Sequence, residues 1–319
     1  MWARAAWTMS VNDGYTTLKR GRMAANHARA RRMRGPAHTA AAVVAALSLA
    51  CTGARLAAGE EPAAAAAASC RAADFRVVLD VGHTAEVPGA ISAHGIPEFL
   101  FNLRLAEDAK QKLVKAGFDK TTLLVTDKPP PLGLLERAWR ANKLGADLFI
   151  ALHHDSVPDY LLHAWDYAGQ PLHYNDDFPG YAIFVSNANG DRAGSLAFGH
   201  VLGQELEARG LAFTPHYTSP VMRHRRRELV DAQAGVYRYD RLAVLERTRM
   251  PAVLLEAGSI INRTEALELA TPERRHLISG ALVAAVTEFC ASRTVARQHH
   301  VIRHIAAPAG AMRRRVGSR

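Results

Sequence analysis

Four residues of this 319-residue chain could together perform metal-assisted hydrolysis: His83, Glu98, His153 and Glu256. Three of them follow strand-like hydrophobic runs, since His83 comes after FRVVLDVG, His153 after ADLFIAL and Glu256 after PAVLL. The carboxyl ends of strands in an open α/β sheet form the crevice where ligands bind. Two imidazoles and a carboxylate that meet there would form a catalytic zinc site with one position open for water. A further carboxylate nearby would transfer protons.

Each of these residues also has an ordinary interpretation. The chain has 15 histidines, and a single histidine is more often a structural or surface residue than a ligand. Glu98 follows Pro97 and opens a helix-like stretch, where an acid also stabilises the helix dipole. Glu256 could be an ion-paired acid at a strand end. The coincidence of all four at element ends favours the metal site.

Neighbouring polar residues are candidates for orienting the ligands or binding substrate. They are Asp80, Asn102, His154, Asp155 and Asn262. Asp80 and Asp155 could accept hydrogen bonds from the imidazoles, although each could instead cap a turn. Because side chains alternate across a strand, only one of His153 and His154 should face the site.

The hydrophobic pattern predicts the elements that position these residues. Strand-like runs alternate with helix-like stretches, which is typical of a layered α/β fold. We expect one domain with a central, mostly parallel or mixed sheet of about six strands, flanked by helices. The expected strands are 75–80, 122–126, 147–152, 181–185, 242–245 and 252–256, and the expected helices are 98–116, 132–144, 193–209 and 272–292.

Two long segments, 156–180 and 213–240, fit no regular element. Loops of this length inside a compact domain are usually functional or disordered. Both segments are rich in aromatic, Asn/Asp and Arg residues, which suits a polar ligand made of sugar and peptide. A plain surface insertion is equally compatible with the pattern.

The two ends of the chain differ in charge from the middle. Residues 1–36 and 293–319 each carry a net +7, so the total of +10 leaves −4 for the residues between them. This distribution argues against nucleic-acid binding, which needs a basic face on the folded domain. We expect a low-complexity linker at 59–73, the catalytic domain at 74–293 and a basic, disordered tail at 294–319.

Residues 1–58 are predicted to be a basic leader and signal peptide, with translation starting at Met33 as an alternative. The stretch RARRMRG precedes the apolar run AAAVVAALSLAC, and small residues then suit cleavage near Ala58. The apolar run is too short to span a bilayer as a helix of the mature protein. We therefore expect an exported protein, periplasmic or secreted, without a mature transmembrane helix.

The three cysteines are compatible with export. Cys51 lies in the leader, Cys70 just before the first expected strand and Cys290 at the end of the last expected helix. Exported proteins meet an oxidising compartment. We predict a Cys70–Cys290 disulfide that joins the two ends of the domain, with two unpaired thiols as the alternative.

Residues 77–118 resemble the opening of the zinc-dependent N-acetylmuramoyl-L-alanine amidases, the amidase_3 family. The shared motifs are a strand with Asp-x-Gly-His, a Pro-Gly-Ala loop, Gly-x-x-Glu and an Asn-Leu helix. The matching residues are Asp80, Gly82, His83, Pro88, Gly89, Ala90, Gly95, Glu98, Asn102 and Leu103. ADLFIALHHDS and MPAVLLEAGSIIN resemble two later strands of the family, the second carrying its catalytic Glu and a following Asn. The resemblance covers roughly residues 75–290.

This resemblance implies one Zn²⁺ ion held by His83, Glu98 and His153, with water as fourth ligand and Glu256 as general base and acid. It also implies cleavage of the amide between N-acetylmuramic acid and L-alanine of the peptidoglycan stem peptide. Peptidoglycan is then the expected partner. We also expect a monomer, and a protein activator is a further candidate partner.

The chain departs from the family pattern beside the ligands. Thr84-Ala85 stand where the family often has Gly-Gly, and Ala151 replaces a Ser. His154-Asp155 replace Ala-Asn. These departures remove no ligand, but they bear on the loop beside the metal and on substrate preference.

Two other functions stay open from the sequence. One is a zinc peptidase or another amide hydrolase that uses the same ligands on a different substrate. The other is a non-catalytic cell-wall-binding or activator protein that kept the fold, against which the presence of all four residues argues.

Overall fold

The computed structural model describes residues 70–305, with side chains described up to residue 293. The predicted leader, the alternative start at Met33 and most of the predicted linker therefore lie outside the described residues. Within the described part, no helix is both long and apolar enough to cross a membrane.

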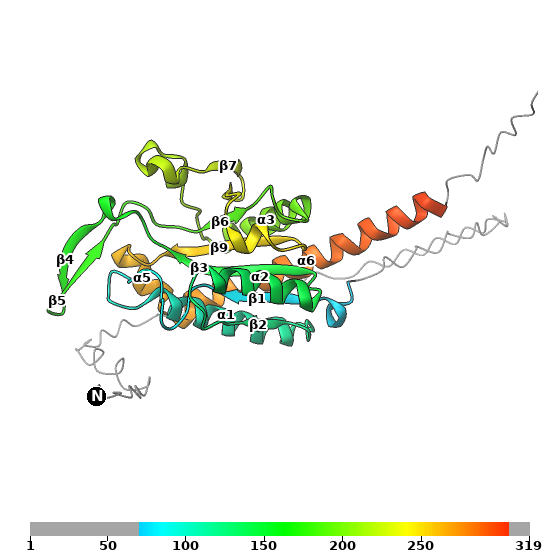
Figure 1. The fold of residues 1–319 in the computed structure, drawn as a ribbon, viewed down its shortest axis with the longest axis horizontal. Helices are drawn as coiled ribbons and strands as arrows, with labels where there is room; N and C mark the ends of the chain where they lie inside the picture. The colour runs from blue at the N-terminus through cyan, green and yellow to red at the C-terminus, as the bar shows by residue number, and fades with distance from the viewer. Residues whose placement is uncertain (1–69, 306–319) are drawn as a thin grey trace, which may run out of the picture. The chain divides into compact units, whose positions relative to one another are not determined.

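A seven-stranded mixed sheet forms the centre of a single α/β domain (Figure 1), as the alternating pattern predicts. The strand order is β2-β1-β3-β9-β6-β8-β7. The strands are β1 (Val77–Val81), β2 (Thr122–Leu124), β3 (Leu148–Asp155), β6 (Ala182–Val185), β7 (Glu228–Asp231), β8 (Val236–Arg238) and β9 (Ala252–Ser259). β2, β1, β3 and β9 run parallel, whereas β6 is antiparallel to β9 and β7 is antiparallel to β8.

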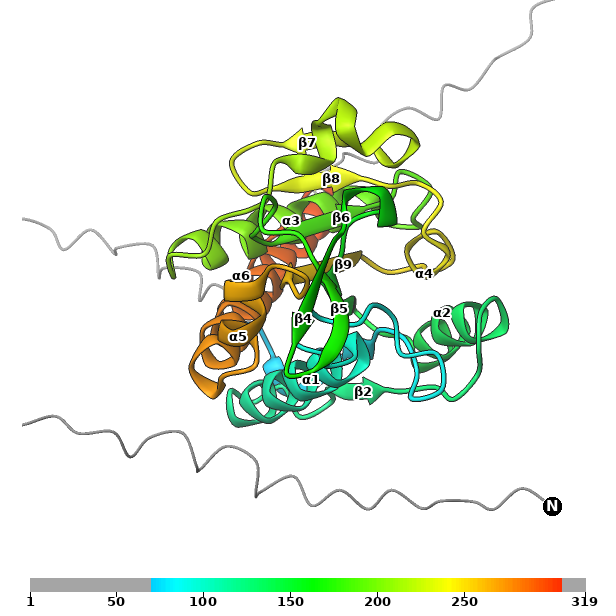
Figure 2. The same cartoon turned by 90° about the vertical axis from the view of Figure 1, so that its left-hand side faces the viewer.

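The central strands are hydrophobic on both faces because helices cover both faces of the sheet. Val77 and Leu79 pack toward one face, and Val78 and Phe149 pack toward the other. The first face is covered by α1 (Glu98–Lys115), α3 (Arg192–Glu207) and α6 (Pro272–Ile305). The second is covered by α2 (Leu132–Leu144) and α4 (Ala243–Glu246), as Figure 2 shows. The short α5 (Arg263–Leu269) follows β9.

The structure corrects two predictions, the strand at 242–245 and the disordered tail after residue 293. The run 242–245 is not a strand, because it forms the start of α4; a short apolar run does not distinguish helix from strand. The predicted disordered tail is wrong over 294–305, where α6 continues to Ile305. That stretch contains no Gly or Pro to end a helix. Residues 306–319 lie outside the described chain.

The two segments expected to lack regular structure contain short elements. Residues 156–180 hold η2 (Asp159–Leu161) and a hairpin of β4 (His163–Tyr167) and β5 (Gln170–Tyr174). Residues 213–240 hold η3 (His216–Thr218), η4 (Pro220–Arg225), β7 and β8. The hairpin turn uses Ala168 and Gly169, both with positive φ. Such turns usually read Asn-Gly or Asp-Gly, so Ala-Gly gave a weak signal.

A disulfide joins Cys70 to Cys290, with their Cα atoms 5.4 Å apart. The bond ties the segment before β1 to α6 across a sequence separation of 220 residues. This confirms the predicted pairing and excludes two unpaired thiols in the structure.

Candidate metal centre

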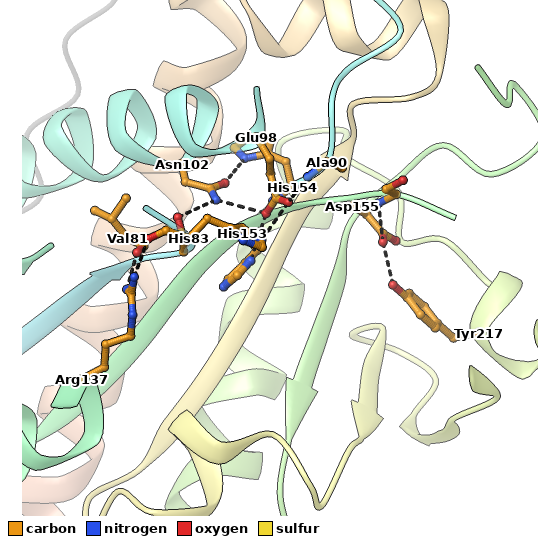
Figure 3. A network of polar contacts seen from close by, with 12 residues as sticks. Val81, His83, Ala90, Glu98, Asn102, Arg137, His153, His154, Asp155 and Tyr217 are labelled. Atoms are coloured by element: carbon orange, nitrogen blue, oxygen red, sulfur yellow. Dashed lines mark hydrogen bonds and ion pairs between the residues drawn. The ribbon is translucent and has the colours of Figure 1, made fainter. Parts of the chain in front are cut away.

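Three of the four predicted residues meet at the carboxyl ends of β1 and β3 (Figure 3). One ligand atom from each of His83, Glu98 and His153 lies within 4.8 Å of the others. The Glu98 carboxylate stands between the two rings, since Oε2 is 2.9 Å from His83 Nε2 and Oε1 is 3.0 Å from His153 Nδ1. Two imidazoles and one carboxylate are the donor set of a common catalytic zinc site.

A strained turn after β1 places His83. His83 has a φ of 66°, in the left-handed region that non-glycine residues seldom adopt. The guanidinium of Arg137, on α2, holds this turn by donating hydrogen bonds to the carbonyl oxygens of Val81 and His83. Arg137 also pairs with Asp80 at 2.6 Å. Backbone strain that is held by such contacts is typical of functional sites.

Two glycines let the backbone approach the ligands closely. Gly89 has a φ of +79°, and a Cβ there would collide with the Glu98 carboxylate and the His83 ring. A Cβ on Gly82 would collide with the His153 ring. The loop between β1 and α1 therefore fits around the three candidate ligands only with glycine at these positions.

The Glu98 carboxylate is ionised and firmly oriented. The side chain is buried at the first residue of α1 and accepts a 3.1 Å hydrogen bond from Asn102 Nδ2. Burial alone would raise the pKa of Glu98, but hydrogen bonds from His153 and His83 outweigh it and bring the pKa well below its usual value. A buried anion between two imidazoles is an environment that favours a cation.

His154 does not join its neighbour His153 in the cluster. Its ring is buried and its Nδ1 lies 2.7 Å from Asn102 Oδ1 on α1. Burial lowers the pKa of His154 to about 3, so the ring is neutral. Asn102 therefore connects His154 to Glu98, and the alternation expected across the strand holds.

Glu256 lies beside the cluster on the adjacent strand. It is the register partner of His153 across the parallel pair β3–β9, so both side chains leave the same face. Its Oε2 is buried without a hydrogen-bond partner, and no Lys or Arg among the described residues forms an ion pair with it. Burial raises the pKa of Glu256 well above its usual value, and the carboxylates of Asp155 and Glu98 raise it further. A perturbed acid of this kind is a candidate for proton transfer.

Asp155 joins a network that the sequence did not reveal. Tyr217, on η3, donates a 2.7 Å hydrogen bond to its Oδ1 (Figure 3), and His216 Nε2 lies 3.8 Å from its Oδ2. Burial raises the pKa of Asp155 to about 7, although the hydrogen bonds from Tyr217 and Ser156 oppose the rise. A buried Asp implies that some hydrogen-bond donor lies beside it. The sequence does not show which one, because Tyr217 is 62 residues away from Asp155.

The remaining two candidates support neighbouring elements. Asp80 accepts from Arg137 rather than from an imidazole, and burial raises its pKa to about 6 against the effect of that cation. Arg137 was missed from the sequence, although an acid in an apolar strand implies a buried cation. Asn262 caps α5 by accepting from the backbone N–H groups of Thr264 and Glu265, and it lies outside the cluster.

A cavity of about 300 Å³ opens beside the two histidines. Apolar side chains from α2, α4, β9 and the connecting segments form much of its wall, and three cationic side chains also line it. The apolar residues are Val87, Pro130, Leu134, Leu242, Val244 and Leu254, and the cationic residues are Lys128, Arg137 and Arg241. A substrate held at the cluster would therefore meet an apolar wall with positive charge beside it.

Comparison with known proteins agrees with the motifs. The family model for N-acetylmuramoyl-L-alanine amidases, Amidase_3, matches residues 77–288. Amidase AmiC of Neisseria meningitidis is 35% identical over 80 residues, which cover 25% of this chain and 19% of AmiC. Amidase Rv3717 of Mycobacterium tuberculosis is 26% identical over 163 residues, covering 51% of this chain and 56% of the relative. The chain thus matches at most about half the length of these curated relatives.

The fold is also that of solved amidases. The crystal structure of the amidase Ami1 from Mycobacterium smegmatis matches with a TM-score of 0.53 and 20% identity, covering 69% of this chain and 98% of Ami1. At that identity the likeness shows the fold alone. Because the family model spans well over half of the sequence, including all four residues at the site, the chain belongs to the Amidase_3 family of N-acetylmuramoyl-L-alanine amidases.

Proposed function

We propose that this protein is a zinc-dependent amidase that cleaves the bond between N-acetylmuramic acid and L-alanine in peptidoglycan. Membership of the family supports the reaction class. The observation that carries the proposal is the Glu98 carboxylate set between two imidazoles, with Glu256 on the neighbouring strand. No other group of three His, Cys, Asp or Glu side chains in the described chain comes together in this way.

The residues present fit a zinc ion. His83, Glu98 and His153 would hold it through two nitrogens and one oxygen, a donor set that zinc favours over magnesium or calcium. When bound, the ion supplies Lewis acidity, which polarises a carbonyl group and eases the deprotonation of water. Asn102 holds Glu98 in the orientation that the site needs.

Glu256 would move the proton. It would accept the proton of the attacking water and then deliver it to the nitrogen of the leaving amine. Its raised pKa suits both steps, because a carboxylate with a higher pKa is a stronger base and yet can hold the proton until the amine leaves.

Export agrees with this substrate, which lies outside the cytoplasm. The leader-like sequence of residues 1–58 supports a periplasmic or secreted protein. The disulfide supports the same location, because such bonds persist in oxidising compartments.

Product analysis tests the proposal directly. Purified peptidoglycan is incubated with the protein, with and without a chelator, and the products are analysed by mass spectrometry. We expect free stem peptides that begin with L-alanine, and their loss when the chelator is present. Cleavage between amino acids of the stem would instead show that the protein is a peptidase. Equal cleavage with and without the chelator would show that the reaction needs no metal ion.

A further inference from the structure

We propose that residues 223–227, Arg-His-Arg-Arg-Arg, form a docking surface for the carboxylates of peptidoglycan stem peptides. These five consecutive basic residues, called the basic loop here, span the end of η4 and the turn toward β7. The segment lies beside β7 at the edge of the sheet (Figures 1 and 2). This inference rests on the proposed function, because that function supplies the substrate.

The basic loop is anchored to the domain. Met222, directly before it, is buried at 1% exposure in the core on the α2 side of the sheet. Tyr160 donates a 3.0 Å hydrogen bond to the carbonyl of Val221, and the N–H of Arg227 donates at 2.8 Å to the carbonyl of Tyr217. The charges are therefore held at defined positions.

The positive charge of the loop is not neutralised within the described chain. Arg223, Arg225 and Arg226 are exposed, and none of the loop arginines forms an ion pair with a described carboxylate. The next acid, Glu228, pairs instead with Arg238 at 2.7 Å. Like charges held side by side repel each other. Since residues 37–292 carry a net −4, this cluster is a local exception that suits an anionic partner.

Arg223 is arranged for planar recognition, whereas Arg227 helps to hold the loop. The Arg223 guanidinium lies 4.1 Å from the ring centre of Tyr160, and Arg227 lies 3.7 Å from that of Tyr239. Stacking on a ring fixes the plane of a guanidinium, and for Arg223 it leaves the edge for a bidentate carboxylate. Arg227 instead donates from Nη1 to the carbonyl oxygens of His224 and Arg226. Arg223 also has a φ of 50°, a strained conformation for a residue with a side chain.

The basic loop is linked to the candidate metal centre through Tyr217. Tyr217 accepts from Arg227 through its backbone and donates through its hydroxyl to Asp155, two residues after His153. Tyr160, under Arg223, lies in the segment that directly follows β3. A polymer with many carboxylates that binds the loop would therefore be held on the same domain as the proposed reaction site at the carboxyl ends of β1 and β3.

The composition of the loop favours this polymer over a membrane. Segments that bind lipid surfaces combine basic residues with Trp, Phe or Leu that enter the bilayer. The basic loop has no such residue, and the apolar Met222 beside it points into the core. Stem peptides, in contrast, offer repeated carboxylates without needing an apolar contact.

Binding to purified sacculi by co-sedimentation tests the docking surface. The variant Arg223→Gln/Arg225→Gln/Arg226→Gln should bind about tenfold more weakly, because each exposed charge pair contributes roughly a twofold effect. The control Lys115→Gln/Lys143→Gln/Arg192→Gln removes the same charge from exposed positions on α1, α2 and α3 and should bind normally. Replacing the three arginines by lysine should restore part of the affinity, because lysine keeps the charge but cannot pair bidentately, and this separates charge from folding.

Salt and chemical modification sharpen the test. Raising the salt from about 0.1 M to about 1 M shortens the screening length from ~10 Å to ~3 Å, so binding of the unaltered protein should fall toward that of the glutamine variant. Sacculi whose carboxyls are amidated should bind both proteins equally weakly. Equal losses in the control variant, or undiminished binding to amidated sacculi, would overturn the proposal.

Two further outcomes identify what failed. Arginine-dependent binding to anionic phospholipid vesicles, without binding to sacculi, would replace the proposed partner by a membrane. Arginine-dependent binding to sacculi that are not hydrolysed at the amide would uphold the docking surface and refute the proposed function. Hydrolysis by the glutamine variant should show a raised KM for sacculi, with a smaller effect on kcat.

Discussion

Glu256 differs from the other acids at the site because no hydrogen bond or cation satisfies it. Glu98 is held by two histidines and an asparagine, and Asp155 is held by Tyr217. A buried carboxyl oxygen without such contacts, like Glu256 Oε2, costs stability and is typical of functional sites. The same environment that raises the pKa of Glu256 would equip it for the proposed proton transfer.

The substitution Glu256→Gln should abolish most turnover while leaving the metal bound. Proton-transfer catalysis typically contributes ~10²–10⁴-fold, so kcat should fall by about that factor. Metal content, measured by elemental analysis, should match that of the unaltered protein. The exposed acid Glu107 on α1 provides the control as Glu107→Gln. Near-normal kcat in the Glu256 variant would show that another residue is the general base.

The pH dependence of activity should respond to Asp155. Glu256 accepts a proton only when ionised, so activity falls as the pH drops through its pKa, which burial and neighbouring carboxylates raise. Asp155→Asn removes one of those negative charges, so the acid limb of kcat/KM should move to lower pH. The family pattern has Asn at this position, which makes the substitution compatible with the fold. A shift to higher pH would refute the assignment.

Residues of the candidate metal site that lie in short sequence motifs could be predicted from the sequence. Residues that reach the site from distant segments could not. His83, Glu98 and His153 follow the motifs of the strand ends and the helix start, and they meet. Tyr217 and Arg137 were not predicted, because their roles depend on how η3 and α2 pack against the strands. Asn262 matches a motif, yet the structure uses it as a helix cap.

At the scale of elements, the loop between β1 and α1 determines the spacing of the ligands. Gly89 lies against both Glu98 and His83, and no other residue type fits there with a φ of +79°. The positive φ alone would make a substitution of Gly89 little more destabilising than the same substitution at an exposed turn. The collision with the ligands is what makes this glycine specific to the site.

The substitution Gly89→Ala should therefore weaken metal binding far more than an equivalent change elsewhere. Gly169, in the hairpin turn, has a φ of +78° with nothing within 4 Å of its missing Cβ. Gly169→Ala should cost roughly 1 kcal/mol of stability through backbone strain and leave the metal in place. Calorimetric titration with zinc and chemical denaturation separate the two effects. Equal zinc affinity in both variants would show that Gly89 has no special role.

Most elements could be read from hydrophobic periodicity, and the failures have physical causes. The helix 132–144 agrees with α2 at both ends, because Gly145 ends it in a left-handed conformation. The strand predicted at 242–245 is wrong because four apolar residues suit a buried helix turn as well as a strand. β7 and β8 were missed because strands of four and three residues are too short to show alternation.

At the scale of the whole molecule, the disulfide closes the domain. Cys70 and Cys290 join the two ends of the described core across 220 residues. Such a bond stabilises a protein mainly by restricting the unfolded chain. The covalent closure was expected from the positions of the cysteines, and it is consistent with the export that the leader-like sequence predicts.

Removing the disulfide should lower stability without altering the site. The variant Cys70→Ala/Cys290→Ala should lose about 2–5 kcal/mol of unfolding free energy. Denaturant titration measures the loss, and a reducing agent should destabilise the unaltered protein by a similar amount while leaving the variant unchanged. Activity under native conditions should persist, because neither cysteine contacts the cluster. An unchanged unfolding midpoint would mean that the bond contributes nothing.

We propose that three side chains from distant parts of the chain hold one zinc ion beside Glu256. Anomalous X-ray scattering from crystals of the purified protein, recorded on either side of the zinc absorption edge, tests it most directly. We expect a single strong peak about 2.0–2.1 Å from one ring nitrogen each of His83 and His153 and bonded to Glu98. A zinc peak at any other residues, or none in a protein that hydrolyses peptidoglycan, would contradict it.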